Sequence, residues 1–270
     1  MKTRVLAAAA LLPLLLIIVL ALPSVFTAIL FGAAAAVAAY ELLYRTGLVK
    51  NIRLVAYSAL AAVGVSFWGW MGCPQVWAVA GIFLFTALMF GELLMAHTQL
   101  RFEKVALCYA AGLLVPYLLT SLVRIRAMDG GKFYILTAFV IAFMADSGAY
   151  FVGRAFGKHK LARVISPNKT VEGAAGGVIS AVLGMLLYSV ILQVAFKLNV
   201  NYLYAIFYGI FGSLASIVGD LAFSVIKRQN QVKDYGNLIP GHGGVLDRFD
   251  SMTMVAPLVE ALLLTIPFAV

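Results

Sequence analysis

Long apolar runs follow one another along nearly the whole chain, with short polar stretches between them. A helix needs about 20 mostly apolar residues to cross a bilayer. The runs that approach this length are residues 4–22, 24–43, 54–71, 76–96, 105–123, 133–153, 173–196, 203–226 and 252–269. None alternates as the strands of a barrel do, and lipid offers backbone groups no partner outside a helix. The pattern predicts an all-α, polytopic integral membrane protein with about nine transmembrane helices.

The two halves of the chain differ in polarity. Residues 1–130 hold about five predicted spans and few candidate chemical groups, whereas residues 131–270 contain two polar loops, at about 154–172 and 227–250. Little chain remains for a separate soluble domain. We therefore divide the chain into an N-terminal transmembrane region, 1–130, and a C-terminal transmembrane region, 131–270, that carries the candidate catalytic groups.

Charge is sparse but unevenly placed. Hydrophobic residues make up 63% of the chain and charged residues 11%, with a net charge of +9. With nine spans, 16 of the 20 lysines and arginines lie in loops on one side of the membrane. The positive-inside rule then places the N-terminus and both polar loops in the cytoplasm and the C-terminus outside. This distribution explains the positive charge through membrane topology, so we expect no nucleic-acid partner.

Small residues and isolated carboxylates interrupt several apolar runs. The sequence "GAAGG", residues 173–177, permits close helix approach, either within one subunit or in a homodimer. Glu41 and Glu260 lie near predicted helix ends, where we expect their carboxylates to reach the headgroup region.

A stripe of polar residues lies within the run 203–226. Its members are spaced three, four, four and three residues apart, on one helix face: Ser213, Ser216, Asp220, Ser224 and Lys227. A carboxylate inside a membrane costs about 2.5 kcal/mol or more unless it has a partner or water. A structural ion pair between Asp220 and a lysine of a neighbouring element would meet this cost, but it would not require the serines. We therefore favour Asp220 as a metal ligand at the base of a polar cavity.

Asp146, Tyr150 and Arg154 are each four residues apart and share a face of the run 133–153. Asp146 and Asp220 both lie about two turns from the predicted cytoplasmic ends of their helices. Like charges at one depth repel each other unless a cation lies between them. Because carboxylate oxygens suit Mg²⁺, the two helices predict a magnesium site.

The polar segment 227–250 is rich in turn-forming and charged residues. Pro240, Gly241, Gly243 and Gly244 surround His242 and break any helix, and such a turn can direct backbone amides at an anion. Its cationic side chains are Lys227, Arg228, Lys233 and Arg248. Asp247 and Asp250 are three residues apart and can share a face. Cations for phosphate and carboxylates for metal are what nucleotidyl transfer requires.

The segment "SVIKRQNQVKDYGNLIPGHGGVLDRFDS", residues 224–251, resembles the signature of the phosphatidate cytidylyltransferase (CDP-diacylglycerol synthase) family. That pattern is Ser, two residues, Lys-Arg, four residues, Lys-Asp, then Pro, one residue, His-Gly-Gly, one residue, Leu-Asp-Arg, and one residue before Asp. The stretch 146–173 is also similar to the family, with Asn168 where a basic residue is expected before Lys169. The resemblance covers roughly the C-terminal half.

The resemblance implies transfer of CMP from CTP to phosphatidic acid, with Mg²⁺ and room for a second metal ion, in a bacterial inner membrane. The residues expected in catalysis are Asp220, Lys227, Arg228, Lys233, Asp234, His242, Asp247 and Arg248. Those expected to bind substrate are Tyr150, Ser166, Asn168, Lys169, Ser224, Gly243 and Gly244. Those expected to hold metal are Asp146, Asp220, Asp247 and Asp250.

Two other functions fit parts of the pattern. A CTP-dependent kinase for polyprenol or another lipid alcohol would move the γ-phosphate, and its hydroxyl acceptor would need a base. An ion-coupled transporter would use Asp146 and Asp220 as carrier sites, but the sequence lacks the broken helices and repeats expected of a transporter. The complete signature favours cytidylyl transfer over both.

Overall fold

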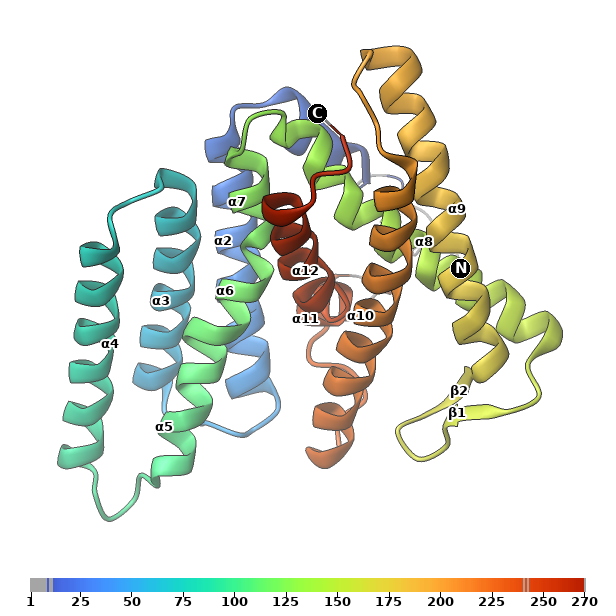
Figure 1. The fold of residues 1–270 in the computed structure, drawn as a ribbon. Helices are drawn as coiled ribbons and strands as arrows, with labels where there is room; N and C mark the ends of the chain where they lie inside the picture. Colours follow the sequence, from blue (N-terminus) through green and yellow to red (C-terminus); the bar gives the residue numbers. More distant parts are fainter. Residues whose placement is uncertain (1–8, 10–11, 240, 242, 270) are drawn as a thin grey trace. The chain divides into compact units, whose positions relative to one another are not determined.

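The computed structural model describes residues 9, 12–239, 241 and 243–269, and the chain divides into two compact units. The first unit comprises Met1–Asp129 and Gln229–Phe249, and the second comprises Gly130–Arg228 and Asp250–Val270. Helices dominate both units (Figure 1). The segment 229–249 therefore leaves the second unit, folds with the N-terminal helices and returns.

Seven helices among the described residues are long and apolar enough to cross a membrane. They are Ser24–Arg45, Ile52–Met71, Gln75–Met95, Phe102–Ala127, Gly131–Phe156, Val171–Phe196 and Tyr202–Gln229. Two shorter apolar helices, Leu12–Ala21 and Met252–Thr265, fall within the other two predicted runs, and part of the run 4–22 lies outside the described residues. The all-α polytopic fold is confirmed, while the number nine stays a prediction.

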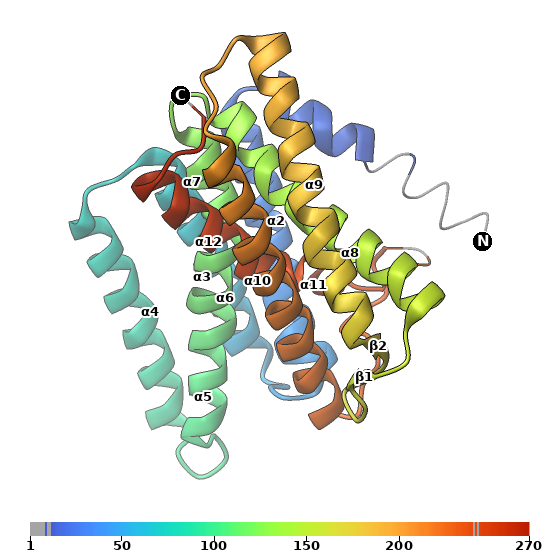
Figure 2. The same ribbon diagram turned by 45° about the vertical axis from the view of Figure 1, so that its right-hand side comes forward.

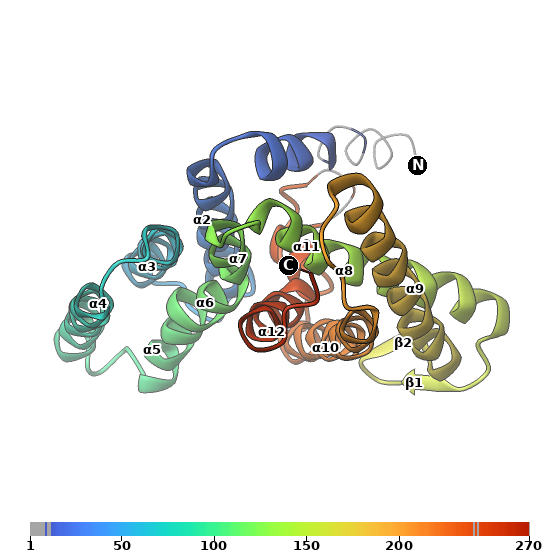
Figure 3. The same ribbon diagram turned by 45° about the horizontal axis from the view of Figure 1, so that its top comes forward.

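The first unit is built from the N-terminal helices and one returning segment. Its elements are η1 (Ile17–Ala21), α2 (Ser24–Tyr40), η2 (Glu41–Arg45), α3 (Ile52–Met71), α4 (Gln75–Met95), α5 (Phe102–Tyr109), η3 (Ala110–Leu114), α6 (Val115–Leu119), α7 (Ser121–Ala127) and α11 (Leu246–Phe249). Figures 1 and 3 show α3 and α4 as an antiparallel hairpin, whose turn uses the left-handed Gly72 (φ 57°).

The core of the first unit forms where α2 packs along α3. The small residue Gly32 allows this approach, because a Cβ there would lie 3.2 Å from the Cβ of Ser66. The Ser66 hydroxyl donates a hydrogen bond of 2.9 Å to the carbonyl of Ala28 on α2, so the buried polar group is satisfied. From the returning segment, Phe249 contacts Phe31 of α2 edge to face at 5.8 Å.

The second unit contains α8 (Gly131–Phe156), β1 (Lys160–Ala162), β2 (Ser166–Thr170), α9 (Val171–Phe196), α10 (Tyr202–Gln229) and α12 (Met252–Thr265). Helices α8 and α9 pack closely (Figure 2). A Cβ on Gly177 would lie 2.8 Å from the carbonyl oxygen of Ala145, and one on Gly148 would lie 2.7 Å from that of Gly176. The small residues of "GAAGG" thus serve packing within the chain, and a homodimer stays a prediction.

A short antiparallel hairpin, β1–β2, lies within the predicted loop 154–172, which had given no strand signal. Lys160 pairs with Thr170, and Ala162 pairs with Ser166. The Thr170 hydroxyl then accepts the N–H of Gly173 at 3.1 Å and caps α9. This cap fixes β2, and with it Lys169, at the end of the α8–α9 pair.

Candidate active site

Asp220 of α10 has partners from its own helix and from the hairpin. Lys169 of β2 forms an ion pair with one carboxylate oxygen, and the Ser224 hydroxyl, one turn along α10, donates to the other at 3.3 Å. The two charged side chains are only 29% and 28% exposed, so loss of either would leave a poorly solvated charge. The contact between Lys169 and Asp220 is the one expected if Asp220 forms a structural ion pair. It also brings together Lys169, a predicted substrate-binding residue, and Asp220, a predicted metal ligand.

A cavity of about 520 Å³ lies beside this pair, between α8, α9, α10 and the hairpin. Small residues of α9, among them Gly173 and Gly177, line one wall. The predicted site residues that line it are Asp146, Tyr150, Ser166, Asn168, Lys169 and Asp220. Arg154 and Ser216 also line it, and Arg154 donates to the Tyr150 hydroxyl at 3.1 Å. The volume is in the range typical of small-molecule sites.

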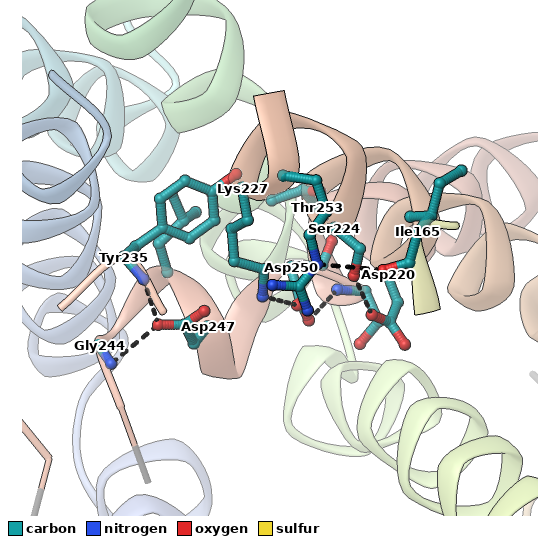
Figure 4. Close-up of polar contacts among 12 residues, drawn as sticks. Ile165, Asp220, Ser224, Lys227, Tyr235, Gly244, Asp247, Asp250 and Thr253 are labelled. Carbon is teal, nitrogen blue, oxygen red and sulfur yellow. Dashed lines mark hydrogen bonds and ion pairs between the residues drawn. The ribbon is translucent and has the colours of Figure 1, made fainter. Parts of the chain in front are cut away.

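A second charged pair joins the two ends of the segment 229–249. Lys227, near the end of α10, points toward Asp250 before α12, with 3.7 Å between Nζ and Oδ2 (Figure 4). Burial, reinforced by the negative charges of Asp220 and Asp146, raises the pKa of Asp250 to about 6, although Lys227 opposes the shift. Burial is the main cause of the raised pKa, and the neighbouring carboxylates of Asp220 and Asp146 add a repulsion that a cation would relieve.

Arg228, the next residue after Lys227, contacts the hairpin. Its guanidinium Nε donates to the carbonyl of Ile165 at 3.3 Å. The contact holds the end of α10 against the turn between β1 and β2. Arg228 has an exposed side chain, so this cation lies where a charged substrate can reach it.

Asp247 belongs to the first unit and lies in α11. Its buried carboxylate accepts the backbone N–H groups of Tyr235 at 2.8 Å and Gly244 at 3.0 Å (Figure 4). Between them the backbone turns through Gly243, whose φ of +87° favours glycine. Asp247 therefore closes the loop 235–247 on itself.

The other predicted residues of this segment have different positions. Lys233, Asp234 and Arg248 have exposed side chains in the first unit. His242 lies outside the described residues. The three exposed residues flank the loop that Asp247 closes, and their roles stay predictions.

The sequence profile of the cytidylyltransferase family matches residues 2–266. The chain belongs to this family. It is 38% identical over 274 residues to the phosphatidate cytidylyltransferase of Bacillus subtilis (strain 168), with 97% of each chain covered. It is 37% identical over 273 residues to the protein of the same name from Staphylococcus haemolyticus (strain JCSC1435), covering 98% of this chain and 99% of that one. The similarity therefore extends well beyond the C-terminal half that the two motifs had indicated.

In this cytidylyltransferase chain, the structure gives Glu41 a position that the sequence analysis did not predict. The residue does not reach toward the headgroups, because its side chain is buried with 2% exposure. Its carboxylate accepts the N–H groups of Val245 at 3.0 Å and Leu246 at 2.9 Å. The sequence feature that could have identified Glu41 is the one that identified Asp220, a carboxylate within an apolar run. Because Glu41 lies near the predicted end of its helix, we had expected it to reach the headgroup region instead.

The expected Mg²⁺ ligands of this family member were Asp146, Asp220, Asp247 and Asp250. Within the part of the chain that the structure describes, no three His, Cys, Asp or Glu side chains are grouped closely enough to hold a metal ion. The donor chemistry nevertheless fits Mg²⁺ in the second unit, where the charges of Asp146 and Asp220 both act on Asp250. Asp220 and Asp250 each have a lysine partner there, whereas Asp247 holds backbone amides of the first unit.

Proposed function

We propose that the protein transfers CMP from CTP to phosphatidic acid, giving CDP-diacylglycerol and pyrophosphate, as a step of phospholipid biosynthesis. The observation that carries the proposal is the identity of 38%, over 97% of both chains, to a protein named phosphatidate cytidylyltransferase. The cavity of the second unit supports it, because Lys169 and Arg154 line it together with the carboxylates of Asp146 and Asp220. A polyphosphate nucleotide needs cationic partners of this kind.

In the proposed reaction, a phosphate oxygen of phosphatidic acid attacks the α-phosphorus of CTP. A new bond forms between that oxygen and phosphorus, the bond from the α-phosphorus to the bridging oxygen breaks, and pyrophosphate leaves. The attacking phosphate is already an anion, so it needs orientation more than a general base. We expect Lys169 and Arg228 of the second unit to orient phosphates, and we expect Lys227, Lys233 and Arg248 to act likewise.

We further propose that the reaction requires Mg²⁺, with Asp220 and Asp250 as ligands and Asp146 beside them. When bound, the ion would neutralise charge on the triphosphate and on the leaving pyrophosphate. The support lies in the negative charges of Asp220 and Asp146 that act on Asp250 and in the partly buried carboxylate of Asp220. Lys169 and Lys227, which contact these carboxylates, hold positive charge at the place where phosphate would lie.

The same proposal includes a setting for the enzyme. We expect it in the cytoplasmic membrane of a bacterium, with its N-terminus and cavity facing the cytoplasm, where CTP is available. The asymmetry of lysines and arginines between the two sets of loops supports this orientation.

The test uses the purified protein, phosphatidic acid, Mg²⁺ and CTP labelled on the α-phosphate. Label in the lipid fraction is the expected result, and CTP labelled on the γ-phosphate should leave the lipid unlabelled. Transfer of the γ-label to lipid with release of CDP would instead indicate a lipid-alcohol kinase and overturn the proposal. Omission of Mg²⁺, followed by its restoration, tests the metal requirement separately.

A further inference from the structure

The helix that begins as α2 changes its geometry where it meets the returning segment. At Glu41 it becomes the π-helical turn η2 (Glu41–Arg45), a rare conformation that is frequent at functional sites. Both ends of this turn contact the segment 229–249. Glu41 accepts two backbone N–H groups, and the Arg45 guanidinium donates to the Asn237 side chain at 3.2 Å.

Both carboxylate oxygens of Glu41 accept hydrogen bonds from the returning segment. One oxygen accepts the N–H of Val245 and the other accepts the N–H of Leu246, the pattern of an ionised carboxylate, which offers only acceptors. The side chain is buried with 2% exposure. Water therefore cannot easily replace either hydrogen bond, and loss of the carboxylate would leave buried amides unsatisfied.

Two glycines of the segment pack directly on this carboxylate. A Cβ on Gly236 or on Gly244 would lie 2.7 Å from the Cδ of Glu41, so it would displace the carboxylate from its hydrogen bonds. Both residues have ordinary negative φ values, because only Gly241 and Gly243 among the described glycines of this segment have positive ones. Close approach to Glu41, and not backbone conformation, therefore requires glycine at positions 236 and 244.

We propose that Glu41 is a positioning residue for the reaction, and this inference rests on the proposed function. Because its carboxylate is buried, we expect Glu41 to act through the loop and not on the substrate. It fixes the backbone at Val245 and Leu246, two and three residues before the exposed cation Arg248. Asp247 fixes Tyr235, next to the exposed Asp234. Charged side chains that are themselves exposed thus receive defined positions from a backbone held by buried carboxylates.

The first experiment replaces Glu41 by Gln, which keeps the volume but offers only one acceptor oxygen. Glu92→Gln is the matched control, since Glu92 is also buried in an apolar helix of the first unit, at 6% exposure, and pairs with Arg53 away from the loop. We expect kcat/KM for CTP to fall roughly 10- to 100-fold in Glu41→Gln, from the loss of one hydrogen bond to a charged group. Glu92→Gln should retain near-normal kcat/KM.

Amide hydrogen exchange measures the anchoring independently of activity. In Glu41→Gln, peptides that cover 243–249 should exchange faster while peptides of α3 and α9 keep their protection. Unchanged exchange in 243–249 would overturn the anchor. Faster exchange with wild-type kcat/KM would overturn its role in positioning. Inactivity of the unaltered protein with CTP and phosphatidic acid would instead overturn the proposed function, while the exchange result would still decide the anchor.

A suppressor pair tests the close packing itself. Gly236→Ala should lower kcat/KM because its Cβ meets the Glu41 carboxylate. Glu41→Asp shortens the acid by one methylene and makes room for that Cβ, so Glu41→Asp/Gly236→Ala should be more active than Gly236→Ala alone. If the two substitutions acted independently, their fold losses in kcat/KM would multiply. A double variant whose loss in kcat/KM equals that product would overturn the proposed contact.

Discussion

The ion pair between Lys169 and Asp220 allows one double variant to separate a structural role from a chemical one. Asp220→Asn removes the negative charge at nearly constant volume, and Lys169→Met removes the ammonium while keeping an apolar stem. Both side chains are less than one third exposed, so either single variant leaves an incompletely solvated charge behind. A structural role and a chemical role both predict lower activity for each single variant. They make different predictions only for the double variant.

The expected size of each single effect follows from the contact. A hydrogen bond to a charged group contributes about 1.5–3 kcal/mol, which corresponds to a factor of roughly 10 to 150 in rate at 1.36 kcal/mol per tenfold change. If Asp220 holds the metal ion and Lys169 a phosphate, the losses should accumulate and the double variant should fall roughly 10²- to 10⁴-fold. If the pair is only structural, the double variant leaves neither charge unpaired and should recover most of the loss.

The assay is incorporation of α-labelled CTP into lipid by purified protein, with the thermal midpoint measured in parallel. The pair Arg101 and Glu103 serves as control, because its side chains are 76% and 72% exposed and such surface pairs contribute about 1 kcal/mol or less. Near wild-type turnover in Lys169→Met/Asp220→Asn would refute the chemical role of both residues. A double variant with much lower turnover than either single variant, at an unchanged thermal midpoint, is the expected result.

Three further predictions concern other parts of the molecule. Because the folded protein raises the pKa of Asp250 to about 6, stability from its protonation is present at acid pH and is lost as pH rises through about 6. Asp250→Asn should therefore reduce the gain in thermal midpoint between pH 7.5 and pH 5 in Mg²⁺-free buffer. Arg248→Lys should raise KM for CTP about 10-fold if its grip on phosphate is bidentate, and an unchanged KM would contradict this. Gly148→Ala should destabilise the protein by about 1–3 kcal/mol through overpacking. Gly91→Ala should not, because an added Cβ there would meet no atom within 4 Å beyond its chain neighbours and the nearby backbone of its own helix.

The sequence was most informative where a single helix carries the pattern. Apolar runs located the seven long helices found among the described residues, because their length is set by the bilayer and not by distant contacts. Asp220 was predicted at the base of a polar cavity and Asp146 at a similar depth on another helix, and both residues line one cavity. The helical period determines which residues share a face of a helix, and when few helices pack together this limits the residues that each side chain can contact.

The sequence was least informative where partners are far apart along the chain. Glu41 and Leu246 are separated by 205 residues, and no spacing rule connects them. The hairpin β1–β2 was missed because its strands have only three and five residues, too few for an alternating pattern. The ion pair of Asp220 with a lysine of a neighbouring element was considered, but the identity of Lys169 as that partner came only from the hairpin geometry.

The glycine-rich turn binds anions, but in the structure these anions are the protein's own carboxylates. The amide of Gly244 donates to Asp247, and the amides of Val245 and Leu246 donate to Glu41. These amides are therefore committed to the fold and do not form the phosphate cradle that the turn had suggested. We therefore expect phosphate recognition to depend on the cationic side chains of residues 227–250, which are Lys227, Arg228, Lys233 and Arg248. Substitution of these cations should consequently weaken CTP binding without loosening the loop, whereas substitution of Glu41 should loosen the loop first and weaken binding as a result.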